Sequence, residues 1–352
     1  MARRLLFGSL IAFGVTLIAT PAFACGGLIG PNGAVNLSRT TTLAAYHNGI
    51  EHYVTAFTFT GATKGQFGSI VPLPGIPTKV ERGGDWTLQR LIRETDPPTP
   101  EAFALFGAAA ASRDAQVILQ VRIDALDITV LKGGGDEVGA WAKNHGFRLP
   151  PDAPEVLNFY ASRSPIFLAA VFDADAARAR GQSIGDGTPV HITIPTANPW
   201  VPLRILGLGK IEGEKVEADV YLLNDRKPAL LPDPNANGLT LQVSEPASAT
   251  LLKDLRSDKG MGWIPQQAWL SKIRIDGPAS NLKFDLAIDA SGRGQPSLRD
   301  AGLAPFGPIQ PPAPWVGWVL LLAAVGLGLP IFGAAFLARM ATRRVPPGAG
   351  AA

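Results

Sequence analysis

The feature that most constrains this chain is an uncharged segment near its C-terminus. Residues 315–338, WVGWVLLLAAVGLGLPIFGAAFLA, contain no charged side chain. As a helix rising ~1.5 Å per residue, the segment would extend ~36 Å and could cross a hydrocarbon core of ~30 Å with some tilt. Lipid offers the backbone no hydrogen-bond partners, so such a span is helical. We therefore predict one transmembrane helix at 315–338.

The flanking residues predict the orientation of that helix. Trp315 and Trp318 stand at one end, as aromatic residues do at a membrane interface. Arg339, Arg343 and Arg344 follow the other end, and arginine clusters stay on the cytoplasmic side. The bulk of the chain is therefore expected outside the cytoplasm. A proline-rich stretch, an apolar span and arginines are also the plan of a sorting signal that is cut and exchanged for an anchor, and this alternative stays open.

The N-terminus has the three zones of a secretory signal peptide. Two arginines precede the apolar run LLFGSLIAFGVTLIA, and the sequence Ala-Phe-Ala at 22–24 is a small-residue cleavage pattern. We predict a signal peptide over residues 1–24, with cleavage between Ala24 and Cys25.

Cys25 is the only cysteine in the chain, so no internal disulfide can form. A catalytic thiol needs a base and a pocket that lowers its pKa, and a position beside two glycines at a new N-terminus is poorly suited to that. Lipoprotein signals place a Leu-like residue three before the cysteine and small residues between the two. This chain has Ala22 at the first of those positions and the bulky Phe23 at the next. We interpret Cys25 as the residue left after cleavage, with lipidation as the alternative.

The charge of the chain separates its ends from its middle. Residues 25–314 carry 27 Lys and Arg against 29 Asp and Glu, a net charge of −2, although the sequence pI is about 9.0. The basic residues in excess lie at the two ends, where they concern membrane orientation. Nucleic acid is therefore excluded as an expected partner.

Strand-like patterns outnumber helical ones, which predicts an α+β fold dominated by antiparallel or mixed sheets with a few short helices. The clearest local signal is Asn48-Gly49 between two strand-like runs, which is typical of a two-residue hairpin turn. In that register His47 pairs with Ile50, and Ala45 pairs with His52.

Short helices are predicted at four places. Asp85 is the expected N-cap of WTLQRLIRE, and a second helix is expected over AFALFGAAAA at 102–111. A third ends at Gly146, and a fourth begins at Asp152. The whole chain is then divided as follows: signal peptide 1–24, larger α+β part 25–225, linker 226–238, smaller β part 239–290, proline-rich stalk 291–314, transmembrane helix 315–338 and basic cytoplasmic tail 339–352.

Several stretches together resemble a known family. CGG after a signal peptide, an aromatic hairpin, IVPLPGIP and LDITVLKGGGDEVGAWAKNHGFRLPPDAPEVLNFY resemble the exported bacterial family called domain of unknown function 2330. The resemblance runs from Cys25 to about Asn224, and it implies placement in a bacterial envelope without implying an activity. Family members commonly carry a second cysteine shortly after the first. This chain has none there, so no shared disulfide or metal role is implied for Cys25.

The sequence offers few candidates for chemistry. His47 and His52 share one face of the predicted hairpin and are the only candidate metal ligands, but no third ligand is apparent. Histidine on an exposed hairpin face is more commonly an ordinary polar surface residue than a metal ligand. His191 alternates with Val190 and Ile192 and is expected to face solvent or a polar seam. Known hydrolase, metalloprotease and phosphate-binding motifs are missing from the sequence. No catalytic residue and no cofactor is therefore predicted.

Two classes of function follow. The favoured one is a non-enzymatic protein of the bacterial plasma membrane, whose extracytoplasmic domain binds another envelope component, either protein or glycan. Tryptophans 200, 263 and 269, which stand near prolines, fit such a contact surface, although core packing is the commoner place for tryptophan. The alternative is an envelope hydrolase or metal-dependent enzyme that uses His47 and His52.

Overall fold

The computed structural model describes residues 27–30, 33–34, 40–58, 66–96, 117–181, 187–289, 294 and 296–304. The predicted signal peptide with Ala24 and Cys25, the predicted helix at 102–111 and the predicted span at 315–338 lie outside these residues. In the part of the chain that is described, no helix is both long enough and apolar enough to cross a bilayer.

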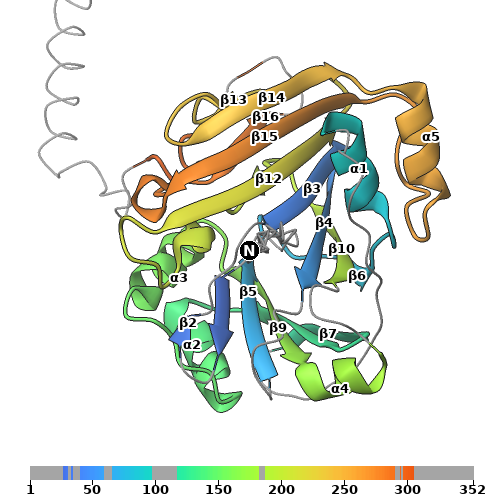
Figure 1. Ribbon diagram of the computed structural model, residues 1–352. Helices are drawn as coiled ribbons and strands as arrows, with labels where there is room; N and C mark the ends of the chain where they lie inside the picture. Colours follow the sequence, from blue (N-terminus) through green and yellow to red (C-terminus); the bar gives the residue numbers. More distant parts are fainter. Residues whose placement is uncertain are drawn as a thin grey trace, which may run out of the picture. The chain divides into compact units, whose positions relative to one another are not determined.

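Two large sheets form the centre of the fold (Figure 1). The seven-stranded sheet has the order β14-β15-β12-β3-β4-β10-β6, and all its pairs are antiparallel except β12 with β3. Its strands are β3 (Thr40–His47), β4 (Ile50–Thr58), β6 (Lys79–Arg82), β10 (Gly187–Pro195), β12 (Lys215–Asn224), β14 (Leu239–Pro246) and β15 (Trp269–Pro278).

The second large sheet has six strands in the order β2-β1-β5-β9-β8-β7, all antiparallel. Its strands are β1 (Gly27–Gly30), β2 (Gly33–Ala34), β5 (Gln66–Pro72), β7 (Val117–Ile123), β8 (Leu126–Lys132) and β9 (Ile166–Asp173). A small sheet joins β11 (Trp200–Val201), β16 (Leu286–Asp289) and β13 (Ala229–Leu231).

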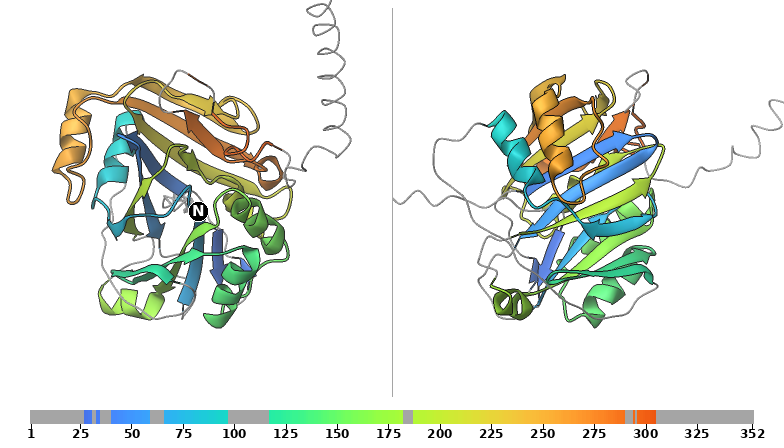
Figure 2. Two further views of the ribbon diagram at one scale, coloured as in Figure 1. Left: turned by 180° about the vertical axis from the view of Figure 1, so that it is seen from behind. Right: turned by 90° about the vertical axis from the view of Figure 1, so that its right-hand side faces the viewer.

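Helices cover the outer faces of the two large sheets, so that four layers result (Figure 2). Apolar side chains of both sheets meet in one central core, α1 and α5 pack on the outer face of the seven-stranded sheet, and α2 and α3 pack on the six-stranded sheet. The helices are α1 (Thr87–Thr95), α2 (Gly135–Asn144), α3 (Ala153–Ala161), α4 (Ala174–Ala179) and α5 (Ala249–Ser257), with short 3-10 turns at Arg204–Gly207 and Ala279–Asn281.

The layering explains why some strands are apolar on both faces. In β9, Leu168 and Ala170 face the central core, whereas Phe167 and Ala169 face α2 and α3. A strand that is covered on both sides has no polar alternation. The predicted β-dominant α+β class is confirmed for the described residues.

The start of α1 differs from the prediction. Asp85 does not cap the helix; it pairs with Arg82 instead. The carboxylate of Asp258, at the end of α5, accepts hydrogen bonds from the backbone N–H groups of Asp85 and Trp86. Capping by a residue distant in sequence leaves no local pattern that could predict it.

The two ectodomain parts expected from the sequence share one sheet. The predicted linker 226–238 contains β13, which pairs with β16. Strands β14 and β15, from the predicted smaller part, continue the sheet of β12 and β3. Folding of this sheet therefore requires both parts.

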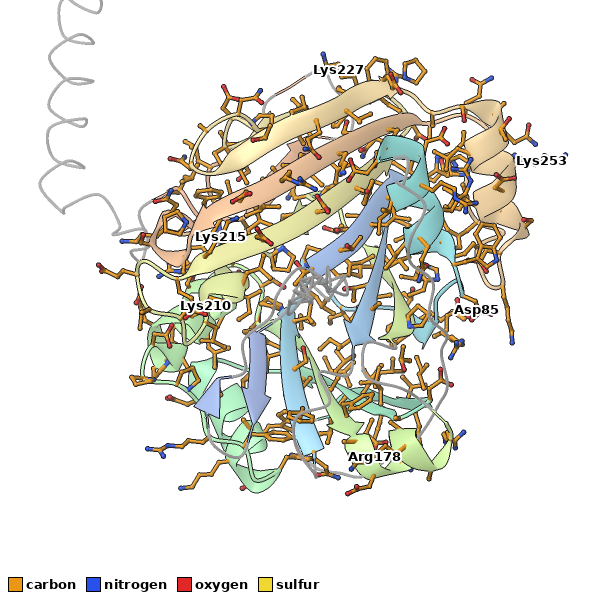
Figure 3. All side chains as sticks on the ribbon, in the orientation of Figure 1. Asp85, Arg178, Lys210, Lys215, Lys227 and Lys253 are labelled. Atoms are coloured by element: carbon orange, nitrogen blue, oxygen red, sulfur yellow. The ribbon has the colours of Figure 1, made fainter. Side chains whose placement is uncertain are left out.

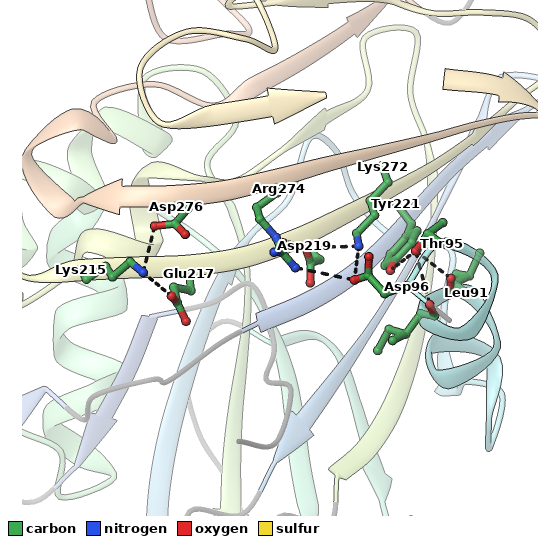
Figure 4. A network of polar contacts seen from close by, with 11 residues as sticks. Leu91, Thr95, Asp96, Lys215, Glu217, Asp219, Tyr221, Lys272, Arg274 and Asp276 are labelled. Atoms are coloured by element: carbon green, nitrogen blue, oxygen red, sulfur yellow. Dashed lines mark hydrogen bonds and ion pairs between the residues drawn. The ribbon is translucent and has the colours of Figure 1, made fainter. Parts of the chain in front are cut away.

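Ion pairs join the end of α1 to this sheet (Figure 4). The fully buried Lys272 lies 2.5 Å from the carboxylate of Asp96, and the hydroxyl groups of Thr95 and Tyr221 are 3.0 Å apart. By contrast, many charged side chains stand on the periphery, among them Lys253 on the outer side of α5 (Figure 3). The polar groups beside α1 therefore hold elements together and are not an open site.

Candidate functional site

The hairpin that carries the predicted ligands forms as expected. Asn48 and Gly49 make the turn with φ angles of 51° and 78°, the left-handed conformation that this turn needs. His47 pairs with Ile50, and Ala45 pairs with His52, which confirms the predicted register. His47 and His52 are consequently on one face of the sheet.

His47 uses both of its ring nitrogens. Its Nδ1 lies 2.5 Å from the carboxylate of Asp225, and its Nε2 lies 2.8 Å from the side-chain nitrogen of Asn48. With one nitrogen facing a carboxylate and the other accepting from an amide, the ring is held at the end of the sheet. His47 therefore has no nitrogen left for another ligand in this arrangement.

His52 has a different partner, which comes from the neighbouring strand β10. Its Nδ1 lies 2.9 Å from Nε2 of His191, a hydrogen bond between two imidazole rings. Trp263, in the loop after α5, stacks on His52 with ring centroids 3.9 Å apart and planes 4° apart. The same indole lies 5.0 Å from the ring of His191, so the three rings form one stack.

A charged pair on the edge strand β6 completes the arrangement. Nδ1 of His191 lies 3.4 Å from a carboxylate oxygen of Glu81, whose other contact is an ion pair of 2.7 Å with Lys79. The sheet register places Glu81 directly opposite His191. We name Lys79, Glu81, His191, His52 and Trp263 the histidine cluster.

Burial keeps the two imidazoles of this cluster neutral. Desolvation lowers the pKa of His52 to about 4, and the nearby His191 and His47 act in the same direction. Desolvation also lowers the pKa of His191 to about 4, while Glu81 opposes that change and Lys79 reinforces it. At neutral pH the two imidazoles of the cluster therefore carry no imidazolium charge.

His191 was predicted to face either solvent or a polar seam, and the structure shows the polar seam. The side chain is 2% exposed and lies in a polar seam beneath Trp263, away from Val190 and Ile192, which join the central core. The sequence pattern indicated the correct face of β10, but it could not indicate what covers that face. Glu81 was not predicted as a neighbour of His191, nor Trp263 as a neighbour of His52, because these contacts arise only from the sheet order and from the loop after α5.

The structure describes no group of three or more His, Cys, Asp or Glu side chains that could hold a metal ion, although this covers only the described residues. The candidate ligands His47 and His52 are bonded to different partners, Asp225 and His191. The histidine cluster instead holds two hydrogen-bonded imidazoles against an indole ring.

A second buried polar cluster is fully paired. Asp285 accepts hydrogen bonds from the backbone N–H groups of Leu203 and Arg204 and from the hydroxyl of Tyr160, and it forms an ion pair with Arg163. The guanidinium of Arg163 also lies over the ring of Trp200. Trp200 is therefore a core residue, and this cluster joins α3 to β11 without leaving a group for a ligand.

The solved structures that are similar to this chain are remote. A crystal structure of baculovirus P35 has 9% identity, covers 72% of this chain and 97% of that chain, and has a TM-score of 0.39. A crystal structure of the caspase-8/P35 complex also has 9% identity, with 72% and 96% coverage and a TM-score of 0.39. A crystal structure of a mutated baculovirus P35 after caspase cleavage has 9% identity, covers 72% of this chain and 99% of that chain, and has a TM-score of 0.38. Similarity at this level supports no conclusion about this chain.

A comparison with curated proteins gives no match. A family model described as an uncharacterized protein conserved in bacteria (DUF2330) matches residues 19–229. That match covers more than half of the chain, and it includes both VPLPGIP and WAKNHGFRLPPDA. The chain therefore belongs to this bacterial family, domain of unknown function 2330.

Proposed function

We propose that this protein is anchored in the bacterial plasma membrane by residues 315–338 and that its folded domain binds a component of the cell envelope. The observation that carries the proposal is the uncharged 315–338 segment, which is followed at once by three arginines. The signal-peptide pattern at 1–24 supports export of the part between the two ends. Membership of a family conserved in bacteria is consistent with an envelope location.

Binding, as opposed to catalysis, is supported by the way polar groups are used. Among the described residues, the buried charges of Asp285, Asp258 and Lys272 have partners that hold helices and strands together. The histidine cluster lies at the outer face of the seven-stranded sheet, where the rings of His52 and Trp263 are half-buried over the buried His191. We assign the binding surface to this cluster.

Cell fractionation of the full chain with a C-terminal epitope tag tests the topology. We expect the protein in the membrane fraction after alkaline extraction, an N-terminus at Cys25, and a tag that is protected when external protease digests the domain. The variant Leu321→Arg with Leu322→Arg interrupts the apolar segment and should release the exported domain from the membrane. Recovery of the intact chain in the cytosol, with residues 1–24 still attached, would overturn the proposal.

A further inference from the structure

Three exposed apolar side chains stand in two segments, one of which is the last that the structure describes. Ile211 is 76% exposed, Leu298 is 58% exposed and Leu303 is 43% exposed. They are half of the large apolar side chains that are exposed among the described residues. Single apolar residues scattered over a surface need no explanation, whereas a group of them marks a contact site. We call Ile211, Leu298 and Leu303 the apolar edge.

Both segments of the apolar edge pack on α3, which is why the three side chains form a group. In the loop that carries Ile211, the backbone N–H of Gly209 donates to the carboxylate of Asp152, directly before α3. In the second segment, Gly302 lies against the ring of Phe159 in the last turn of α3. Asp152 and Phe159 are about 10 Å apart along a helix that rises ~1.5 Å per residue. The two segments therefore lie beside one helix.

The second segment, residues 296–304, belongs to the predicted proline-rich stalk 291–314, but in the structure it packs on the domain. The backbone N–H of Asp285 donates to the carbonyl oxygen of Ala301, 2.9 Å away, and the side chain of Ala301 is 0% exposed. The guanidinium of Arg163 donates to another carbonyl oxygen of this segment. These contacts fix the end of the described chain beside the apolar edge.

The distance from this end to the proposed membrane span is limited by the chain itself. Ten residues, 305–314, separate Ala304 from Trp315. A connection of that length spans at most ~40 Å even when it is fully extended. A surface that is tethered so close to a bilayer meets it at a high effective concentration, so that weak contacts suffice. Three apolar side chains without a tether would bind lipid only weakly.

We propose that the apolar edge lies on the outer surface of the membrane that holds residues 315–338, with its three side chains in the boundary between lipid headgroups and acyl chains. The flanking charges are mixed, since Arg299 follows Leu298 and Glu212 follows Ile211, and both are exposed. The contact is therefore apolar in kind and needs no anionic lipid. This inference rests on the proposed function, because the tether acts only if residues 315–338 are in the membrane.

This orientation keeps the histidine cluster away from the lipid. Helix α3 packs on the six-stranded sheet, whereas Trp263 packs with α1 and α5 on the outer face of the seven-stranded sheet. Lys210, in the loop of Ile211, and Lys253, on α5, lie on opposite sides of the domain (Figure 3). The binding surface that we assign to the cluster therefore faces away from the bilayer, towards other envelope components.

The contact is tested with the full chain reconstituted in liposomes. In a Cys25→Ser background, a nitrobenzoxadiazole probe is attached at Ile211→Cys, Leu298→Cys or Leu303→Cys, and Lys253→Cys is the control on the other side of the domain. The liposomes contain lipid with a doxyl group near the headgroup end of its acyl chain. We expect this lipid to quench the first three probes at least about fivefold more strongly than the control, with or without anionic lipid.

A second set of variants tests whether the apolar side chains make the contact. Leu298→Asp with Leu303→Asp should reduce quenching of a probe at Ile211→Cys at least about fivefold, because carboxylates are costly in that boundary. Ile76→Asp with Ile118→Asp is the matched control, since these side chains are 48% and 38% exposed but belong to other segments. The control pair should leave the quenching unchanged. A first pair that behaves like the control pair would overturn the inference.

The outcomes separate this inference from the proposed function. Weak quenching at all positions, in chains that float with the liposomes after alkaline treatment, overturns the lipid contact and leaves the anchor intact. A probe that is blue-shifted but not quenched shows that a protein surface, such as a second copy of this chain, covers the apolar edge, and this also overturns the lipid contact. If the chain does not float with the liposomes, the anchor fails, and the proposed function fails with it.

Discussion

Glu51 is an acidic residue in an apolar place. Its side chain is 0% exposed, and in the sheet it lies between Tyr46 of β3 and Ile194 of β10. Neither carboxyl oxygen makes a well-formed hydrogen bond with the described residues. Burial raises the pKa of Glu51 to about 8, and the backbone N–H of Trp200 offsets only part of that rise. The side chain is therefore protonated in the folded protein at neutral pH.

This raised pKa makes the protein less stable as the pH increases. In the unfolded chain Glu51 loses its proton near pH 4.5, so its contribution is complete below that pH and is lost as the pH rises through about 8. Glu51→Gln should remove this loss and increase the free energy of unfolding at pH 7 by about 3 kcal/mol relative to its effect at pH 4.5. Urea unfolding of both proteins at the two pH values measures the difference. A glutamine variant that is less stable at pH 7 would show that Glu51 is ionised and paired.

Gly302 is required by both its backbone and its neighbour. Its φ of +71° is left-handed, and a Cβ atom there would lie 2.2 Å from Cζ of Phe159. Gly302→Ala should therefore lower the free energy of unfolding by about 2–5 kcal/mol, from backbone strain and overpacking together. Gly146→Ala is the matched control, because Gly146 has a φ of +77° but nothing within 4 Å of a Cβ atom. The control should cost only about 1–2 kcal/mol, and equal losses in thermal unfolding would contradict the packing argument.

At the scale of elements, α1 depends on α5 for its first turn. The carboxylate of Asp258 is 3.0 Å from the backbone nitrogen of Asp85, 2.9 Å from that of Trp86 and 2.8 Å from the hydroxyl of Thr87. The first N–H groups of a helix have no partner within the helix, so an acidic cap satisfies them and also favours the positive end of the helix dipole. One side chain thus fixes the position of both helices on the sheet.

Removal of this cap should loosen α1 selectively. Asp258→Ala leaves the first turn without an acceptor and should lower the free energy of unfolding by about 1–3 kcal/mol, with faster hydrogen exchange at the start of α1. Asp254→Ala is the control, because Asp254 pairs with Arg90 on the same two helices but is 40% exposed. We expect the control to cost less than about 1 kcal/mol. If exchange in α1 is unchanged in Asp258→Ala, the cap is not what holds the first turn.

The same contrast between local and distant contacts determines what the sequence could predict. The β3–β4 hairpin was predicted to the residue, because Asn48 and Gly49 define the turn chemistry locally. The cap of α1 was not predicted, because Asp258 is more than 170 residues from Asp85 in sequence. The histidine cluster falls between these cases: alternation placed His191 on the correct face, but its bond to His52 joins residues 139 apart in sequence.

At the scale of the molecule, a single sheet joins strands that lie far apart in the described chain, from β3 to β15. Strand β12 pairs in parallel with β3, and β15 and β14 extend the sheet on its other side. The segment 226–238, which was predicted as a linker between two parts, is therefore a connection within one folded unit. Because β3 and β12 lie far apart in sequence, we expect this pairing to form late in folding.

Stability as a function of pH reports on this whole unit. His52 and His191 have pKa values near 4 in the folded state against 6.5 unfolded, so their contribution is complete above pH 6.5 and is lost as the pH falls towards 4. Glu51 acts in the opposite sense between pH 4.5 and 8. Below pH 6.5 the two histidines outweigh Glu51, so the free energy of unfolding rises by about 1.4 kcal/mol per pH unit. Above pH 6.5 only Glu51 acts, and the free energy of unfolding falls by about the same amount per pH unit. We therefore expect the free energy of unfolding to be greatest near pH 6.5, as measured by urea unfolding from pH 4.5 to 8. Glu51→Gln should abolish the fall above pH 6.5 and steepen the rise below it. A curve without a maximum in the unmodified protein, or a fall above pH 6.5 that persists in Glu51→Gln, would show that these groups are not buried as described.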